Sequence, residues 1–180
     1  MDLRQLRLVA RQRQKLVGMC SAEKNRLHKV LVDAGMRINV VVSDIHGASA
    51  RAMVKALIAG QAMYEVLDQK GRLRASRDEL FEALSTEQFS AAHRFVAQEI
   101  MQHIEHIETR IARMDQYLLD GLRAWQPQLK LLQTLPGIDI QGAAMLLVEI
   151  GADMGRSIGR ALAASIPFDH GRDISRGMER

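Results

Sequence analysis

The chain has 180 residues, a formal net charge of +4 and an aromatic content of 4%. The length suits one or two ordinary domains, and the scarcity of aromatic residues argues against a single-strand binder that stacks bases on aromatic side chains. The single cysteine, Cys20, excludes an intramolecular disulfide framework and a cysteine-based metal site. No proline precedes Pro127 and helix-forming residues are frequent, so we expect an all-α protein built from long helices.

The first predicted element is a long helix over residues 3–33, which ends at Gly35. Seven of nine positions spaced alternately by three and four residues are apolar, which is the pattern of a coiled-coil seam. Arg13 and Lys24 interrupt the seam, and such charges set its register or mark where it opens towards nucleic acid. The nine positions are Leu3, Leu6, Ala10, Arg13, Val17, Cys20, Lys24, Leu27 and Leu31.

The basic charge is concentrated on this first helix. Residues 1–30 hold eight basic and two acidic residues, a local net charge of +6, so the rest of the chain has a net charge of −2. A basic arm on a nearly neutral body is a usual feature of proteins that bind phosphate backbones, although a solvated helix face gives the same pattern. We expect nucleic acid to contact six of these residues, Arg11, Arg13, Lys15, Lys24, Arg26 and Lys29.

Turn signals divide the middle of the chain into a short hairpin region around Ser43-Asp44 and three short helices. The helices are expected over residues 49–59, 62–70 and 77–84. Ser76 and Glu79 form a capping-box pattern at the start of the third helix. Ser85 and Gln88 form a second such pattern, which predicts the start of a longer helix.

The longest predicted helix covers residues 87–125 and ends before Pro127. Its apolar residues repeat about every 3.5 residues through three heptads, with charges on the flanks, which is typical of a coiled coil or a helical hairpin. The helix over residues 3–33 is the natural partner within the chain, and a second copy of the chain is the alternative. The residues assigned to oligomerisation are Ile100, Ile104, Ile107, Ile111 and Met114.

A helix-hairpin-helix pattern occupies residues 132–151. Pro136 and Gly137 separate two apolar segments, and small residues after them permit close helix packing. Free N–H groups at the start of the second helix predict a phosphate contact at Gly137 and Ile138. Asp139 departs from the glycine that is usual at its position, and its negative charge opposes that contact.

No catalytic site and no metal site is predicted. Glu99, His103 and His106 have the spacing of one helix face. The apolar seam places them on its polar flank, however, and a metal site needs three or four ligands supported by neighbouring groups. No apolar run approaches the roughly 18 residues of a membrane span, and the start Met-Asp-Leu-Arg lacks signal-peptide character. We therefore expect a cytoplasmic location and no membrane partner.

Several stretches resemble the insertion-sequence transposases whose catalytic domain carries a DEDD carboxylate set, which are recombinases guided by a structured bridge RNA. The resemblance runs from about Leu3 to Met154, and the stretches follow the order of the family. They are Ala22-Glu-Lys-Asn-Arg-Leu-His-Lys-Val-Leu31, Val42-Ser-Asp-Ile-His-Gly47, Arg51-Ala-Met-Val-Lys-Ala-Leu-Ile-Ala-Gly60, Leu135-Pro-Gly-Ile138 and Glu149-Ile-Gly-Ala-Asp-Met154.

This resemblance implies DNA transposition and recombination as the parent activity. The implied partners are DNA, a structured guide RNA, and a second copy of the chain or an intact transposase. It also implies that the DEDD carboxylates lie before the part corresponding to Met1 and the catalytic serine after the part corresponding to Met154. The chain alone is therefore expected to be inactive and without a cofactor, the divalent metal belonging to the missing catalytic domain. The alternative is a helical oligomerisation module that pairs with intact transposase.

The resemblance also predicts how the chain is divided. Residues 1–126 correspond to the helical coiled-coil linker region of a transposase. Residues 127–154 correspond to the start of its C-terminal domain. Residues 155–180 contain four glycines and five arginines without an apolar period, and the family pattern stops at Met154, so we expect a frameshifted or disordered tail.

Overall fold

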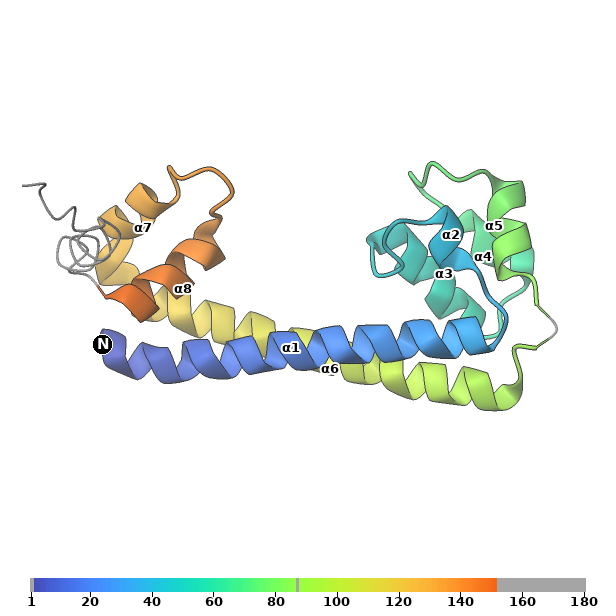
Figure 1. Ribbon diagram of the computed structural model, residues 1–180, viewed down its shortest axis with the longest axis horizontal. Coiled ribbons are helices and arrows are strands. Elements are labelled where there is room, and N and C mark those ends of the chain that lie inside the picture. Colours follow the sequence, from blue (N-terminus) through green and yellow to red (C-terminus); the bar gives the residue numbers. More distant parts are fainter. Residues whose placement is uncertain (1, 87, 152–180) are drawn as a thin grey trace, which may run out of the picture. The chain divides into compact units, whose positions relative to one another are not determined.

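The computed structural model describes residues 2–86 and 88–151, and every regular element within them is a helix (Figure 1). No strand occurs in these residues, which confirms the all-α prediction. Packing divides the chain into two compact units. Among the described residues, one unit is Leu8–Leu118, and the other combines the residues before Leu8 with those from Leu119 onward.

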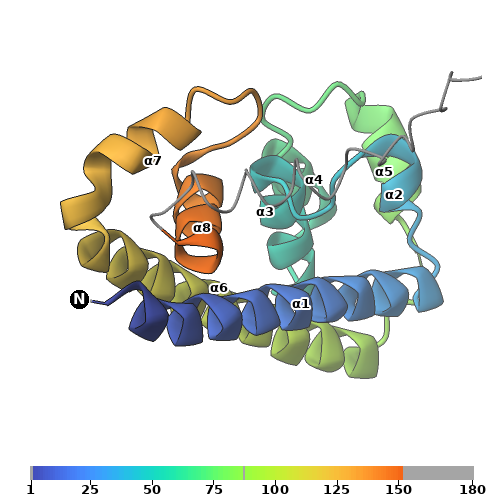
Figure 2. The same ribbon diagram turned by 60° about the vertical axis from the view of Figure 1, so that its left-hand side comes forward.

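The two long helices, α1 (Leu3–Asp33) and α6 (Ala91–Gly121), lie side by side and antiparallel (Figures 1 and 2). The ion pairs between them follow this direction. His93 near the start of α6 has its Nε2 atom 3.1 Å from Oδ2 of Asp33 at the end of α1, whereas Asp115 near the end of α6 pairs with Arg13. The predicted packing of the two long helices within one chain is thus confirmed.

The seam of α1 differs from the predicted one at two positions. Leu16 and Glu23 are buried, whereas Val17 and Lys24 are only partly buried. The predicted and observed seams coincide again at Cys20 and Leu27, so only the order of the three- and four-residue steps differs, and packing against the rest of the core decides that order. The buried charge of the seam is therefore Glu23, whose Oε1 lies 3.0 Å from Nη1 of Arg26. Cys20 is buried as expected, and burial raises the pKa of its thiol.

Four short helices connect α1 to α6 and pack in the pairs α3–α4, α2–α5 and α4–α5. Their bounds are Ile38–Val41 for α2, Ala48–Ile58 for α3, Met63–Asp68 for α4 and Arg77–Leu84 for α5. Three of them correspond to predicted helices. Helix α2 replaces the start of the predicted hairpin region, because one helical turn buries Ile38 and Val42 together.

One of the two predicted capping boxes is present. Ser76 Oγ accepts a hydrogen bond from Glu79 N at 3.2 Å, and Glu79 Oε2 accepts one from Ser76 N at 2.7 Å. The second box is wrong, because Ser85 ends α5 and donates its N–H to the carbonyl of Phe81. Ser90 caps α6 instead, with its Oγ accepting from His93 N at 3.3 Å.

The second unit contains η1 (Arg123–Trp125), α7 (Gln126–Leu132) and α8 (Ile140–Ile150), and α7 packs against α8. Pro127 lies in the first turn of α7, where its missing N–H is tolerated, so it helps to begin a helix. The predicted helix over 87–125 is shorter than expected, because α6 already ends at Gly121. Gly137 makes the turn between α7 and α8 with a φ of 82°, a conformation that favours glycine.

Arg7 joins the first residues of α1 to α8 within this unit. Its Nε donates to the carbonyl of Val148 at 2.8 Å and its Nη2 to that of Glu149 at 3.1 Å. These bonds satisfy carbonyl groups at the C-terminus of α8, where a cation is also favoured by the helix dipole. The units divide between Leu118 and Leu119, whereas the predicted boundary followed residue 126, and the correspondence of either part to a transposase domain stays a prediction. The predicted frameshifted tail, 155–180, lies outside the described residues.

Candidate nucleic-acid interface

One exposed side of α1 carries a row of basic residues. Between Asp2 and Asp33 the sequence has a single acidic residue, Glu23, and that residue is buried. The exposed basic residues follow a heptad-like spacing that places them on one helix face. They are Arg11, Lys15, Arg26 and Lys29. From Lys15 to Lys29 the helix rises about 21 Å, which is long enough to follow several phosphates of one strand.

Two of the six predicted contact residues pair with α6, and a third, Arg26, pairs with Glu23 of α1 itself. Arg13 donates to both carboxylate oxygens of Asp115, and 17% of each side chain is exposed. Lys24 Nζ lies 2.9 Å from Oε1 of Glu108. Both pairs connect α1 to α6 and neutralise the cation, so phosphate contact would require them to separate. The structure therefore leaves four of the six predicted residues on the exposed face.

Glu108 belongs to a charge network that joins α1, α3 and α6. Arg51 Nη1 lies 2.7 Å from Oε2 of Glu108, and Lys55 Nζ lies 2.7 Å from Oε1 of Glu105. Burial pushes the pKa of Glu108 up, but the hydrogen bonds and charges of Lys24 and Arg51 together outweigh it and hold this pKa below its usual range. The hydrogen bond from Lys55 similarly lowers the pKa of Glu105.

Glu108→Gln is expected to lower the free energy of unfolding by about 1 kcal/mol at pH 7, the upper end for partly exposed ion pairs. A carboxyl whose pKa is lowered by folding stabilises the folded state above its ordinary pKa of 4.5. That contribution is lost as the pH falls through the pKa of Glu108 in the folded state. The difference between the parent protein and Glu108→Gln should therefore shrink as the pH is lowered below 4.5, as measured by urea unfolding at pH 7 and at acid pH.

The control for this prediction is Glu99→Gln, an exposed position on α6 outside the network. Its effect on the free energy of unfolding should be below about 0.5 kcal/mol at either pH. An equal loss of stability for Glu108→Gln at neutral and acid pH would contradict the role assigned to the charge network.

Two exposed arginines of α6, Arg110 and Arg113, were not predicted as contact residues. They border an open depression of about 360 Å³ together with Val9, Met114 and Tyr117. From the sequence alone, they are interpreted only as charged residues beside the apolar seam. Their place beside a depression depends on how α1 packs along α6, which residue spacing within one helix does not reveal.

The turn between α7 and α8 has the shape, but not the charge, of a phosphate-binding hairpin. Ile138 N donates to the carbonyl of Leu135 at 3.2 Å across the turn. Asp139 caps α8, with its Oδ1 accepting from Gly142 N at 2.7 Å. A carboxylate thus occupies the helix N-terminus at which a phosphate would bind. The geometry argues against an anion there, and a role for Gly137 and Ile138 in nucleic-acid binding stays a prediction.

The residues assigned to oligomerisation lie within the chain's own core. Ile100, Ile104 and Ile107 are 7%, 0% and 1% exposed. Ile111 and Met114 are partly buried against the same core. A second copy could not contact the three buried residues unless α1 and α6 separated. The packing favours the intramolecular alternative, and self-association through this seam stays a prediction.

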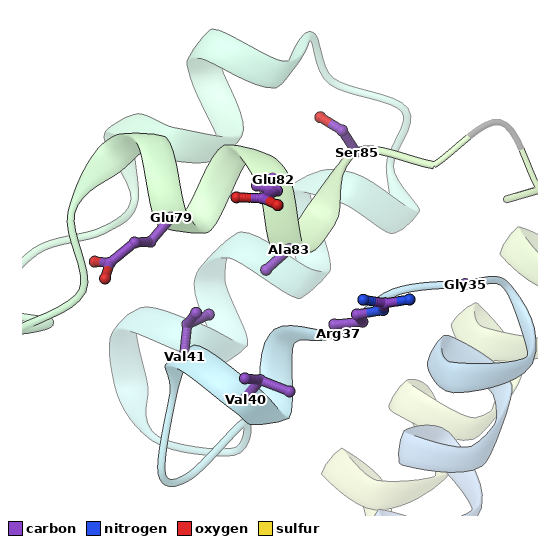
Figure 3. A pocket seen from close by; sticks show the side chains of 8 residues that line it. All are labelled: Gly35, Arg37, Val40, Val41, Glu79, Glu82, Ala83 and Ser85. Carbon is purple, nitrogen blue, oxygen red and sulfur yellow. The ribbon is translucent and has the colours of Figure 1, made fainter.

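A hollow of about 410 Å³ opens between α2 and α5 (Figure 3). Arg37, just before α2, and Val40 lie on one side, and Glu79 and Glu82 of α5 lie on the other. Glu79 is held in the capping box with Ser76. Two carboxylates at this edge make the hollow unfavourable for a phosphate backbone, so it is not part of the candidate interface.

Across residues 2–86 and 88–151, no group of three or more His, Cys, Asp or Glu side chains is placed to share a metal ion. His103 and His106 are exposed, as expected for the polar flank of the seam, and Nδ1 of His103 lies 3.7 Å from Oε1 of Glu23. No helix in the described part of the chain is both long and apolar enough to cross a membrane.

Comparison with known proteins gives no relative from which a function can be taken. No family model, no curated protein and no solved structure matches the chain. The functional assignment rests on the charged surface of α1 and on the stretches that resemble transposases.

Proposed function

We propose that this chain is the nucleic-acid-binding helical part of a transposase of the DEDD, bridge-RNA-guided family. The observation that carries the proposal is the exposed face of α1, which presents Arg11, Lys15, Arg26 and Lys29 on one side of the helix, while Glu23, the one acidic residue of the sequence between Asp2 and Asp33, is buried. Such a row attracts the phosphates of duplex DNA or structured RNA without reading their sequence. The stretches over 22–31 and 42–47 resemble the family and supply the biological context of DNA transposition and recombination.

In this proposal the chain positions nucleic acid and does not cut it. The divalent metal of the family would be held by the DEDD carboxylates, and the matching stretches here correspond to other parts of a transposase. A protein with this task would act in the cytoplasm, together with DNA, a guide RNA and an intact transposase.

Equilibrium binding to a short labelled DNA duplex tests the proposal. We expect a dissociation constant of about 10⁻⁴ to 10⁻⁶ M at physiological salt, the range of non-specific binding. Duplexes of unrelated sequence should bind about equally, because phosphate contacts carry no base information. Absence of binding even at low salt, where such contacts are strongest, is the result that would reject the proposal.

An oligomerisation module that pairs with intact transposase is the second candidate. The observation that favours it is the exposure of large apolar side chains, such as Leu8 at 77% and Tyr117 at 50%. A partner helix would cover them. Such a module would tolerate neutralisation of the basic residues on α1 and would bind no duplex, so the same binding measurement separates the two candidates.

A further inference from the structure

Two of the stretches that resemble transposases meet in one small pocket. Lys24, Asn25 and His28 of α1 line one side, and Asn39 of α2 with residues 42–46 lines the other. The volume is about 180 Å³. Sites for drug-sized ligands have roughly 300–1,000 Å³, so this pocket suits a single flat ring better than a base pair or a whole cofactor.

The polar lining of this pocket has unused hydrogen-bonding capacity. The chain contains only two asparagines, Asn25 and Asn39, and both line it. Nε2 of His28 and Nδ1 of His46 are buried and have no hydrogen-bond partner among the described residues. Burying a polar atom without a partner destabilises the folded protein. A ligand that forms hydrogen bonds here is therefore favoured.

The charges of the pocket do not suit a free phosphate. Lys24 is already paired with Glu108 at 2.9 Å, and Asp44 adds a carboxylate whose Oδ1 accepts from His46 N at 2.8 Å. Burial and the Lys24 charge lower the pKa of His46, against the opposing effects of Asp44 and of a hydrogen bond to the backbone of Lys24. His46 is consequently neutral at physiological pH.

The chemistry of the pocket matches the polar edge of a nucleobase. A neutral imidazole and a carboxamide each offer both a donor and an acceptor, as base edges do. Val42 and Ile45 supply apolar walls that can cover the faces of a flat ring. His28, Asp44 and His46 are not placed to share a metal ion, and the same holds for such side chains in the rest of the described chain.

We infer that this pocket accepts one unpaired nucleobase, whose edge is hydrogen-bonded by Asn25, Asn39, His28 and His46. The inference rests on the proposed function, because the basic face of α1 would bring nucleic acid to the pocket. Lys29 follows Asn25 by about one helical turn and so lies on the neighbouring surface, available to the phosphate of the inserted nucleotide. A base within a duplex has its edge already paired, whereas loop bases can be splayed out and read along this edge. The pocket therefore selects a looped strand over a duplex.

Three probes with equal numbers of phosphates test this selection: an RNA hairpin with an unpaired loop, a fully paired RNA duplex, and a DNA hairpin with the same loop. Asn39→Ala should weaken binding of the RNA hairpin about three- to tenfold, as expected for one lost hydrogen bond, and leave the duplex unchanged. Gln12→Ala removes an exposed amide of α1 outside the pocket and should change neither. Weaker binding of the DNA hairpin by the parent chain would identify RNA as the source of the base.

Imidazole ¹⁵N resonances of the parent chain give a second readout that needs no variant. The signals of His28 and His46 should shift on addition of the RNA hairpin and not of the duplex, while the exposed His106 should shift with neither. If Asn39→Ala and Gln12→Ala bound the RNA hairpin equally well and the histidine signals did not shift, the nucleobase pocket would be wrong. Retained duplex binding in that case would leave the proposed function supported. Failure of the parent chain to bind any of the probes would overturn both.

Discussion

Replacing Ile104 of α6 by alanine is expected to lower the free energy of unfolding by about 2–5 kcal/mol. Ile104 is fully buried in the core that also contains Leu16, Cys20 and Leu27 of α1. The truncation leaves a cavity between two long helices, and the helices cannot move locally to fill it. Ile104→Asp should be more severe, because it places a carboxylate in an apolar core, and about 5–15 kcal/mol is the whole stability of an ordinary domain.

Urea unfolding followed by circular dichroism measures this effect. Val96→Ala on the same helix is the matched control, since Val96 is 43% exposed, and it should change the free energy by less than about 0.5 kcal/mol. Similar effects of Ile104→Ala and Val96→Ala would mean that α1 and α6 do not form the core. If the urea concentration at the unfolding midpoint rose with protein concentration, Ile104 would instead lie between copies of the chain.

Reversing the charges of Lys15, Arg26 and Lys29 to glutamate is expected to weaken duplex binding roughly a hundredfold or more at physiological salt. Each cation that contacts a phosphate releases counterions, and at this salt concentration the loss of three such contacts accounts for about two powers of ten. Glutamate is a good helix former, so the helical content should be unchanged. Electrophoretic or anisotropy titrations of parent and variant measure the change.

A second triple variant separates position from net charge. Arg72, Arg74 and Lys130 are exposed and lie outside α1. Reversing all three to glutamate changes the net charge by the same amount and should weaken binding much less, because these residues do not share a helix face. If both triple variants lost affinity equally, overall charge rather than the exposed face of α1 would account for binding.

The long helices were predictable because their seams extend over many turns, but two of the buried positions of α1 were not. Leu16 and Val17 are both apolar and Glu23 and Lys24 are both charged, so the sequence alone offers no choice between the two positions of each pair. The packed structure buries Leu16 and Glu23. The correct choice depends on the opposing helix, which lies about a hundred residues away in the sequence.

The candidate site was also only partly predictable, because it too depends on contacts between residues that are far apart in the sequence. Clustering of charge located the basic helix, but whether a given cation is available depends on non-local partners, Asp115 for Arg13 and Glu108 for Lys24. By contrast, the cap that opposes phosphate binding at α8 was foreshadowed locally, because aspartate is a favoured N-cap residue. The nucleobase pocket forms because residues 42–46, after α2, lie beside α1. Neither segment alone indicates that the two lie together.

The salt dependence of duplex binding tests the central claim most directly. If Arg11, Lys15, Arg26 and Lys29 contact phosphates while Arg13 and Lys24 stay paired with α6, about four contacts give a slope of log K against log salt between about −3 and −4. Six contacts would give a slope steeper than about −5. We expect the shallower value for the parent chain and a slope near zero for the Lys15, Arg26 and Lys29 triple variant. A parent slope near zero, or a parental slope retained by that variant, would contradict binding through the exposed face of α1.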